Sequence, residues 1–340
     1  MVETQQITDA HFKLLSPDFK HDTKEDTTPA VSFWRGAFGR LKRHRGAMIA
    51  LAILGIIFFA VTASVGFATE ETTSVQNIRQ QNLPPKLPGG VMGFDGSQHL
   101  VGGKTIDAYA QAGVPNEFHI MGTDEFGRDI FKRILYGTRI SLLVALIATV
   151  IDLSIGVLYG MIAGWRGGKT DLFMQRFLEI LAAIPSLVIF VLLILWMKPG
   201  MLTIALGIGL TSWVTMARLV RGEVLHLKSA EFVIAAKTLG TSDWKIAWKH
   251  LLPNMSSTII VQLMFTIPGA IFFEALLSFM GLGLSTASLG TLLNEGQKSF
   301  QFYPYQLVIP MIVLSLLMMS FNALGDGLQD ALNPKETINN

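Results

Sequence analysis

The chain has 340 residues, of which 50% are hydrophobic and only 15% are charged, and its mean hydropathy is +0.45. This balance is too apolar for an ordinary soluble domain and indicates an integral membrane protein. The formal net charge of +2 excludes the strongly basic field that nucleic-acid binding needs. The absence of cysteine excludes disulfides and thiolate metal sites.

A helix needs about 20 apolar residues to cross a bilayer. Six segments meet this requirement and predict an all-α membrane protein with six transmembrane helices. In chain order they are 47–68, 140–165, 180–196, 201–216, 254–273 and 302–324. We expect the third to extend back toward Leu172, the fourth to end at Arg218 and Arg221, and the fifth to continue past Glu274 to Leu284.

The orientation of the chain follows from its basic residues, because cytoplasmic loops carry an excess of Lys and Arg. Five arginines and lysines within 35–45 place the N-terminus in the cytoplasm, and six spans return the C-terminus to the same side. The segment 127–139 opposes this orientation, since it would lie outside although it contains Arg128, Lys132, Arg133 and Arg139. We keep the orientation because the N-terminal cluster is denser and the other loops agree with it.

This topology divides the chain into five units, all in or beside the cell membrane. They are a disordered cytoplasmic N-terminus (1–34), a basic segment with the first span (35–68), an extracellular loop (69–138), a five-helix core with a coupling loop at 225–253 (139–331), and a cytoplasmic tail (332–340). The extracellular loop is expected to end in an interfacial helix, because Ile130, Phe131, Ile134 and Leu135 share one face.

The stretch EFVIAAKTLGTSDWKIAWKHLLP, at 231–253, is polar and helix-prone and lies between two apolar spans. Four apolar residues recur at helical spacing and predict one apolar face: Phe232, Ala235, Ala236 and Leu239. Gly240 is expected to end this helix, Thr241 or Ser242 to cap a second one, and Pro253 to start the next span. The pattern fits either an interfacial hairpin anchored by tryptophans or a docking surface for a cytoplasmic partner.

The spacing of this stretch resembles the coupling loop of ABC-importer permeases, which reads Glu-Ala-Ala, three residues, Gly, nine residues, then Ile-x-Leu-Pro. The matching residues are Ala235, Ala236, Gly240, Leu252 and Pro253. Ile234 and His250 depart from the family's glutamate and isoleucine, and Glu231, one turn earlier, is a candidate replacement for the missing carboxylate. The residues implied to couple the chain to an ATPase are Glu231, Ala235, Ala236, Gly240, Asp243 and Pro253.

Further segments resemble the peptide/nickel group of these permeases, in the family's order and across most of the chain. They are MGTDEFGRDIFKRILYGTRISL (121–142), AIPSLV (183–188), FFEALLSFMGLG (272–283) and NALGDGLQDALNP (322–334). The resemblance implies the type I ABC-importer permease fold with a cytoplasmic coupling helix. It also implies a sister permease, two cytoplasmic ABC ATPases and an extracellular solute-binding protein as partners, besides membrane lipid. Oligopeptides or dipeptides are the expected cargo. Nickel or another small solute is the alternative, and an ion-gradient-driven transporter is the rival class.

Two other patterns bear on function. The GGKT stretches at 102–105 and 167–170 lack the earlier glycine of a phosphate-binding loop, and the histidines show no metal-ligand spacing. We therefore expect neither an enzyme nor a metal or cofactor site. Asp152 and Glu274 lie inside apolar spans, where a carboxylate is costly and commonly functional. They are expected to shape the translocation pathway, with a structural hydrogen bond to a neighbouring helix as the alternative.

Overall fold

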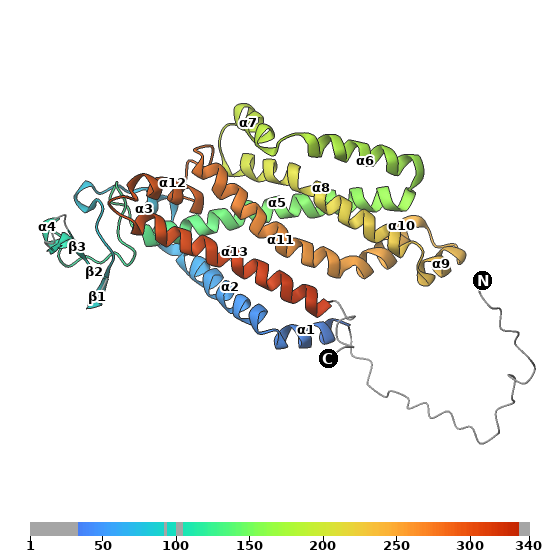
Figure 1. Cartoon of the computed structure of the whole chain (residues 1–340), viewed down its shortest axis with the longest axis horizontal. Helices are drawn as coiled ribbons and strands as arrows, with labels where there is room; N and C mark the ends of the chain where they lie inside the picture. The colour runs from blue at the N-terminus through green and yellow to red at the C-terminus, as the bar shows by residue number, and fades with distance from the viewer. Residues whose placement is uncertain (1–32, 92–93, 100–104, 333–340) are drawn as a thin grey trace, which may run out of the picture.

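The computed structural model describes residues 33–91, 94–99 and 105–332. The N-terminal and C-terminal segments expected to be disordered or cytoplasmic fall almost wholly outside these residues. Long helices run side by side along the molecule (Figure 1). One end carries the short helix α4 (Ala108–Gln111) beside the strands, and the other carries α9 (Glu231–Thr238) and α10 (Asp243–Ile246). We call these the sheet end and the hairpin end.

Within the described residues, five helical segments are long and apolar enough to cross a membrane. Their main helices are α2 (Arg45–Ala63), α5 (Ile130–Arg166), α8 (Met201–Leu227), α11 (Leu252–Phe279) and α13 (Tyr305–Leu332). A sixth span exists if α6 (Gly168–Ala183) and α7 (Ser186–Met197) are taken together, although they are bent by 78°. The expected mostly helical membrane fold is confirmed.

The third span is broken rather than straight, so the expectation of one continuous helix there is wrong. Pro185 lies between α6 and α7, and Ile184 before it adopts an extended conformation with φ −79° and ψ 122°. The ring of a proline disfavours the helical conformation in the residue before it, and proline has no N–H to donate. The helix therefore ends at Ala183 and restarts in a new direction.

Two span ends also differ from expectation. α8 continues past Arg218 and Arg221 to Leu227. The guanidinium of Arg221 makes two bonds of 2.6 Å to the carboxylate of Asp171 on α6. A bidentate pair of this kind compensates much of the cost of placing the charge beside apolar helices. α11 passes Glu274 but stops at Phe279.

The pair α5 and α8 forms the closest helix packing in the bundle. Gly156, Gly160 and Gly164 of α5 follow one another at intervals of four residues. A Cβ at Gly160 would lie 2.5 Å from the carbonyl oxygen of Ala217, and one at Gly156 would lie 2.6 Å from the Cβ of Met216. Small residues at this spacing let two membrane helices approach backbone to backbone, where van der Waals contact drives their association.

The segment between the first two spans folds at the sheet end. It contains the helix α3 (Glu70–Ser74), the 3-10 turns η2 (Ser64–Gly66) and η3 (Ile78–Gln80), and four short strands. The strands form two antiparallel pairs: β1 (Lys86–Val91) with β2 (Phe94–Asp95), and β3 (Ser97–His99) with β4 (Thr105–Asp107). Leu83, Ala108 and Tyr109 are buried together in this segment. The all-α expectation thus holds for the bundle but not for this loop.

The interfacial helix expected before the second span is not a separate element. Residues 130–139 are the first turns of α5, which runs without a break to Arg166. Ile130 and Ile134 pack against Leu292 of α12 (Leu289–Ser299), while Leu135 and Tyr136 pack against Ala68. Protein contacts on both sides take up the apolar face that the sequence suggested for the membrane surface.

Candidate functional site

The stretch at 231–253 forms a helical hairpin at the hairpin end of the bundle. α9 ends at Thr238, Gly240 follows with φ +77°, and the N–H of Thr241 donates to the carbonyl of Ala236 at 3.1 Å. This is a helix C-terminus of the kind that glycine favours, because only glycine adopts positive φ without a steric penalty. The expected helix, turn and second helix are all present.

The second helix leads directly into the fifth span. α10 continues through a π-helical turn, η4 (Ala247–Leu251), into α11, and Pro253 lies in the first turn of α11. Ser242 occupies the N-cap position of α10, but its side chain makes no capping hydrogen bond. The hairpin is therefore tethered rigidly to a membrane-spanning helix at one side.

The two alanines of the hairpin point in opposite directions, which corrects the expectation of a single apolar face. Ala236 is 8% exposed and packs with Val233 in a core shared with α5, α8 and α11. Ala235 is exposed, as are Phe232 and Leu239. Because neighbouring helical residues differ by about 100° in direction, Val233 and Ala236 can form the inner side while Phe232, Ala235 and Leu239 form the outer side.

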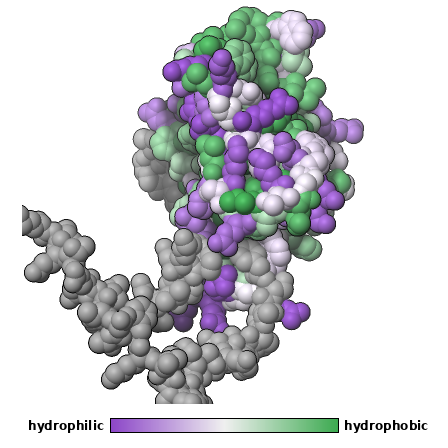
Figure 2. Space-filling view, turned by 90° about the vertical axis from the view of Figure 1, so that its right-hand side faces the viewer, coloured by the Kyte–Doolittle hydropathy of each residue, from purple (hydrophilic) through white to green (hydrophobic). Residues whose placement is uncertain are grey.

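The outer side of the hairpin carries both apolar and charged residues, and Figure 2, which faces this end of the molecule, shows hydrophilic and hydrophobic side chains intermixed there. Glu231 and Asp243 are exposed in the first turns of α9 and α10. Trp244 and Trp248 are also exposed, and their rings meet edge to face at 5.3 Å between centroids. On the outer side of α9, the small Ala235 thus lies between the larger exposed side chains of Phe232 and Leu239.

Of the two acids within the spans, Glu274 is held by hydrogen bonds to other residues of this chain. It is fully buried in α11, and it accepts hydrogen bonds from the hydroxyls of Ser141 at 2.7 Å and Ser278 at 2.8 Å. The hydroxyl of Ser141 comes from α5, so the carboxylate links two spans. This geometry matches the structural alternative more closely than a direct contact with cargo.

Asp152 is also buried, at 1% exposure, on the face of α5 that meets α11. Thr266 of α11 is a hydrogen-bond partner of its side chain, while its Oδ1 has no partner among the described residues. Neither acid faces an open surface. The sequence pattern correctly marked them as unusual but could not show that they point inward.

An open polar groove lies instead on another face of the bundle, near the hairpin end. Its volume is about 430 Å³, and α8, α11 and α13 supply its walls. The lining residues are Leu219, Ser257, Thr258, Val261, Gln262, Phe265, Gln329 and Leu332. On α13, the exposed Asn322 and Asp326 recur at helical spacing with Gln329. Only Gln329 of these three lines the groove, but the polar periodicity within an apolar helix marks the exposed side of α13 beside it in the sequence.

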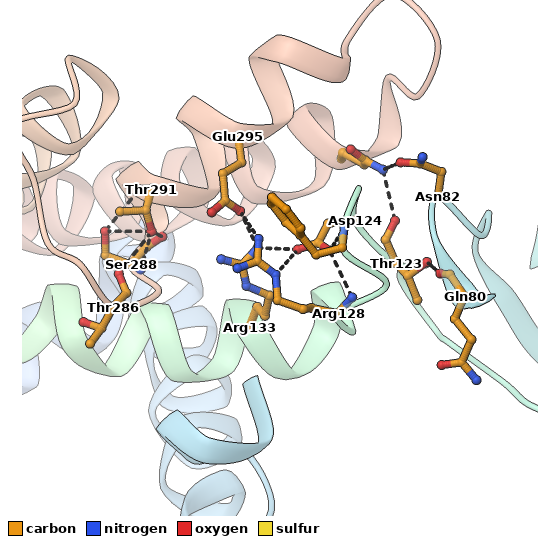
Figure 3. Close-up of polar contacts among 12 residues, drawn as sticks. Gln80, Asn82, Thr123, Asp124, Arg128, Arg133, Thr286, Ser288, Thr291 and Glu295 are labelled. Atoms are coloured by element: carbon orange, nitrogen blue, oxygen red, sulfur yellow. Dashed lines mark hydrogen bonds and ion pairs between the residues drawn. The ribbon is translucent and has the colours of Figure 1, made fainter. Parts of the chain in front are cut away.

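A buried ion-pair cluster joins the motif MGTDEFGRD to α12 at the sheet end (Figure 3). Asp124 is 4% exposed, and its Oδ2 accepts from Arg128 at 2.7 Å and from Arg133 at 2.6 Å. Both arginines also pair with Glu295 of α12. Arg139, at the next turn of α5, donates to the carbonyl of Val61 and the hydroxyl of Ser64.

These contacts account for three of the four cations that opposed the expected orientation, all but Lys132. Arg128, Arg133 and Arg139 are held by acceptors of the protein itself. Burial raises the pKa of Glu295, but the hydrogen bond and charge of Arg133 and the charge of Arg128 outweigh burial, so the pKa lies below its usual value. Gly127 makes the tight turn possible, because its φ is +72° and a Cβ would lie 1.9 Å from the carbonyl oxygen of Asn77.

The chain was compared with known proteins. The family model of the binding-protein-dependent transport system inner membrane component matches residues 156–338, and that of the N-terminal transmembrane domain of oligopeptide transport permease C matches residues 32–85. The chain is 45% identical over 332 residues to the dipeptide transport system permease protein DppC of Lactococcus lactis, covering 95% of this chain and 97% of that protein. It is 36% identical over 316 residues to the oligopeptide transport system permease protein OppC of Bacillus subtilis, covering 92% and 93%.

A solved structure shows the same fold at low sequence identity. The structure of the MetNI methionine ABC transporter in an inward-facing conformation contains a chain that matches with a TM-score of 0.51 at 17% identity. The match covers 60% of this chain and 98% of that chain.

The helical spans, the exposed hairpin and these similarities define a permease subunit rather than an ATPase. The chain belongs to the family of binding-protein-dependent transport system inner membrane components, and is thus a multi-pass inner-membrane subunit of an ABC transporter. The expected family is confirmed, and the rival class of ion-gradient-driven transporter is not supported. Membership implies ATPase and binding-protein partners in general. The structure shows no cluster of metal-ligating side chains within the residues it describes.

Proposed function

We propose that this chain forms half of an ATP-driven import pathway for dipeptides or oligopeptides. The similarity to dipeptide and oligopeptide transport permeases over more than nine-tenths of the chain carries this proposal. Deleting the gene and measuring uptake of a radiolabelled dipeptide, a radiolabelled pentapeptide and nickel ions tests it. Loss of peptide uptake, restored by the wild-type gene, supports the proposal. Loss of nickel uptake alone contradicts it.

The partners proposed are a sister permease, two cytoplasmic ATPases and an extracellular binding protein. The groove on α8, α11 and α13 supports a second permease, because amide and hydroxyl side chains that line an open groove in a span are costly against lipid. A second bundle facing this groove would enclose a water-filled passage. The groove then forms one wall of the pathway. Asp152 and Glu274 would shape that wall from within the packing of α5 and α11.

The hairpin is proposed as the site where an ATPase docks. Ala235, Glu231 and Asp243 are exposed on its outer side and are available to a partner, whereas Ala236, Gly240 and Pro253 maintain its shape. Since α10 continues into α11, a displacement of the hairpin is carried directly to a helix that lines the groove. This continuity supports rigid-body coupling between ATP hydrolysis and the opening of the pathway.

The polar groove leads to a prediction about transport. We expect Gln262→Leu to lower the rate of peptide uptake about 2- to 12-fold, because a hydrogen-bonding group is typically worth about 0.5–1.5 kcal/mol. Uptake into proteoliposomes that contain the purified complex measures this rate. Thr62→Val is the control, because the Thr62 hydroxyl bonds only to carbonyls of its own helix and Thr62 does not line the groove. Equal uptake by both variants would remove Gln262 from the pathway.

The orientation proposed places the hairpin end in the cytoplasm and the sheet end outside, in agreement with the basic residues before the first span. The chain has no cysteine, so single cysteines report on accessibility. Ser74 and Thr170 are exposed at opposite ends. We expect an impermeant thiol reagent to label Ser74→Cys in cells whose outer layer admits the reagent and whose inner membrane is intact. Thr170→Cys should be labelled only after the inner membrane has been permeabilised. The reverse pattern would invert the topology.

A further inference from the structure

Helix α1 (Phe33–Arg43) is the first described element, and its inner side packs against the rest of the chain. It is separated from α2 by His44 alone and crosses the hairpin end of α13 (Figure 1). Leu41 is buried against Ala331, whose carbonyl accepts a 2.8 Å hydrogen bond from Nε of Arg40. Nε2 of His44 lies 3.4 Å from the carboxylate of Asp330. These contacts fix the direction in which the rest of α1 faces.

The outer side of α1 combines aromatic and cationic side chains. Trp34 is 51% exposed and Phe38 is 56% exposed, and Nζ of Lys42 lies 4.7 Å from the centre of the Phe38 ring. Arg35, Arg43 and Arg45 are also exposed. In the part of the chain that the structure describes, no carboxylate lies within 4.0 Å of the cationic groups at 35, 42, 43 and 45.

The position of α1 relative to the bilayer decides what can cover this side. Its last residue is Arg43, and the apolar span α2 begins at Arg45, with Met48, Ile49 and Leu51 exposed around it. A helix joined to a span by one residue cannot leave the membrane boundary. Exposed aromatic rings suit this boundary, and cations beside them lie at the depth of the lipid headgroups.

We propose that the outer side of α1, formed by Trp34, Arg35, Phe38, Lys42 and Arg43, is together with Arg45 at the start of α2 a binding site for anionic phospholipids. Lipid phosphates neutralise the cations, and the aromatic rings enter the acyl boundary. Each cation near an anionic leaflet contributes electrostatic attraction, and none of these cations has an ion-pair partner among the described residues. Through Leu41 and Arg40, the bound lipid holds the end of α13, which also carries the groove residue Gln329. This role does not depend on which solute is transported.

The test compares lipid binding by two triple variants in the intact complex. Arg35→Gln/Lys42→Gln/Arg43→Gln removes three cations from α1, and Arg79→Gln/Lys198→Gln/Lys298→Gln removes three exposed cations elsewhere. Each complex is purified from nanodiscs of phosphatidylcholine and phosphatidylglycerol in equal amounts, and native mass spectrometry counts the retained lipids. We expect the α1 variant to lose its enrichment of phosphatidylglycerol by about 5-fold or more, and the control to keep it. Equal enrichment in both variants would overturn the proposal.

A second measurement does not depend on how well the triple variant assembles. Phe38→Cys, in the naturally cysteine-free chain, carries a polarity-sensitive fluorophore. We expect its emission to shift to shorter wavelength when phosphatidylglycerol replaces phosphatidylcholine. An emission that is the same in both lipids would place Phe38 against water or a protein partner and refute the lipid site.

Discussion

Replacing Ala235 by phenylalanine is expected to detach the ATPase subunits and abolish transport while the helix bundle stays folded. Ala235 is exposed on the outer side of the hairpin, away from the core that takes Ala236 and Val233. In a packed interface, the added volume costs about 1–3 kcal/mol. That free energy corresponds to roughly a 5- to 150-fold weaker association. Copurification of the ATPases with a tagged permease, measured beside peptide uptake, gives the result.

Two controls separate docking from the alternative of a membrane anchor. Ala110→Phe adds the same ring to an exposed helical position at the sheet end and should leave ATPase retention unchanged. Ala235→Ser keeps a small side chain and should behave as wild type. If the hairpin only rests on the membrane surface, the added ring improves its burial in lipid. Full ATPase retention and normal uptake by Ala235→Phe would therefore contradict the docking proposal.

Asp124→Asn is expected to cause the largest loss of stability of any single conservative substitution at the sheet end. Asp124 is 4% exposed, accepts from two arginines, and also accepts from the backbone N–H groups of Phe126 and Arg128. Removing one partner of a buried ion pair costs about 3–5 kcal/mol, because the other charge stays buried without compensation. Thermal unfolding of the purified protein in detergent, followed by circular dichroism, should show a clearly lower midpoint.

Glu125→Gln is the matched control for this experiment, because it makes the same chemical change one residue away. Glu125 is partly exposed, and no ion pair involves it in the described structure. Its midpoint should stay close to that of the wild type. A midpoint for Asp124→Asn equal to that of Glu125→Gln would show that the cluster contributes nothing measurable.

The same cluster predicts how stability depends on pH. The pKa of Glu295 is lower in the folded protein than in the unfolded chain, so the unfolded chain binds protons first as the pH falls. The contribution of Glu295 is therefore fully present above its ordinary pKa of about 4.3 and is lost as the pH falls through the lowered folded value. Glu295→Gln should remove this part of the acid sensitivity.

Five of the six expected spans and the hairpin were predictable because both depend on local patterns. Burial of about 20 consecutive apolar residues in lipid is a property of the segment itself. The turn at Gly240 likewise follows from the steric freedom of one residue. The broken third span has a local cause, Pro185, but the size of the bend, 78°, is a feature of the tertiary structure.

Other features depended on what lies opposite each side chain. Periodicity placed Ala235 and Ala236 on one apolar face, but the core under α9 takes Ala236 and leaves Ala235 free for a partner. Asp152 and Glu274 were recognised as unusual, yet their inward direction depends on how α5 and α11 meet.

Arg128 and Arg133 show most clearly the difference between what local sequence predicts and what tertiary contacts decide. Their charges looked inconsistent with an external position as long as the sequence was read locally. Glu295, which pairs with Arg128 across 167 residues of chain, resolves the inconsistency. Hydropathy and backbone preferences act over a few neighbouring residues and can be read along the chain. Ion pairs and helix packing depend on distances in space, so they exist only once the bundle has closed.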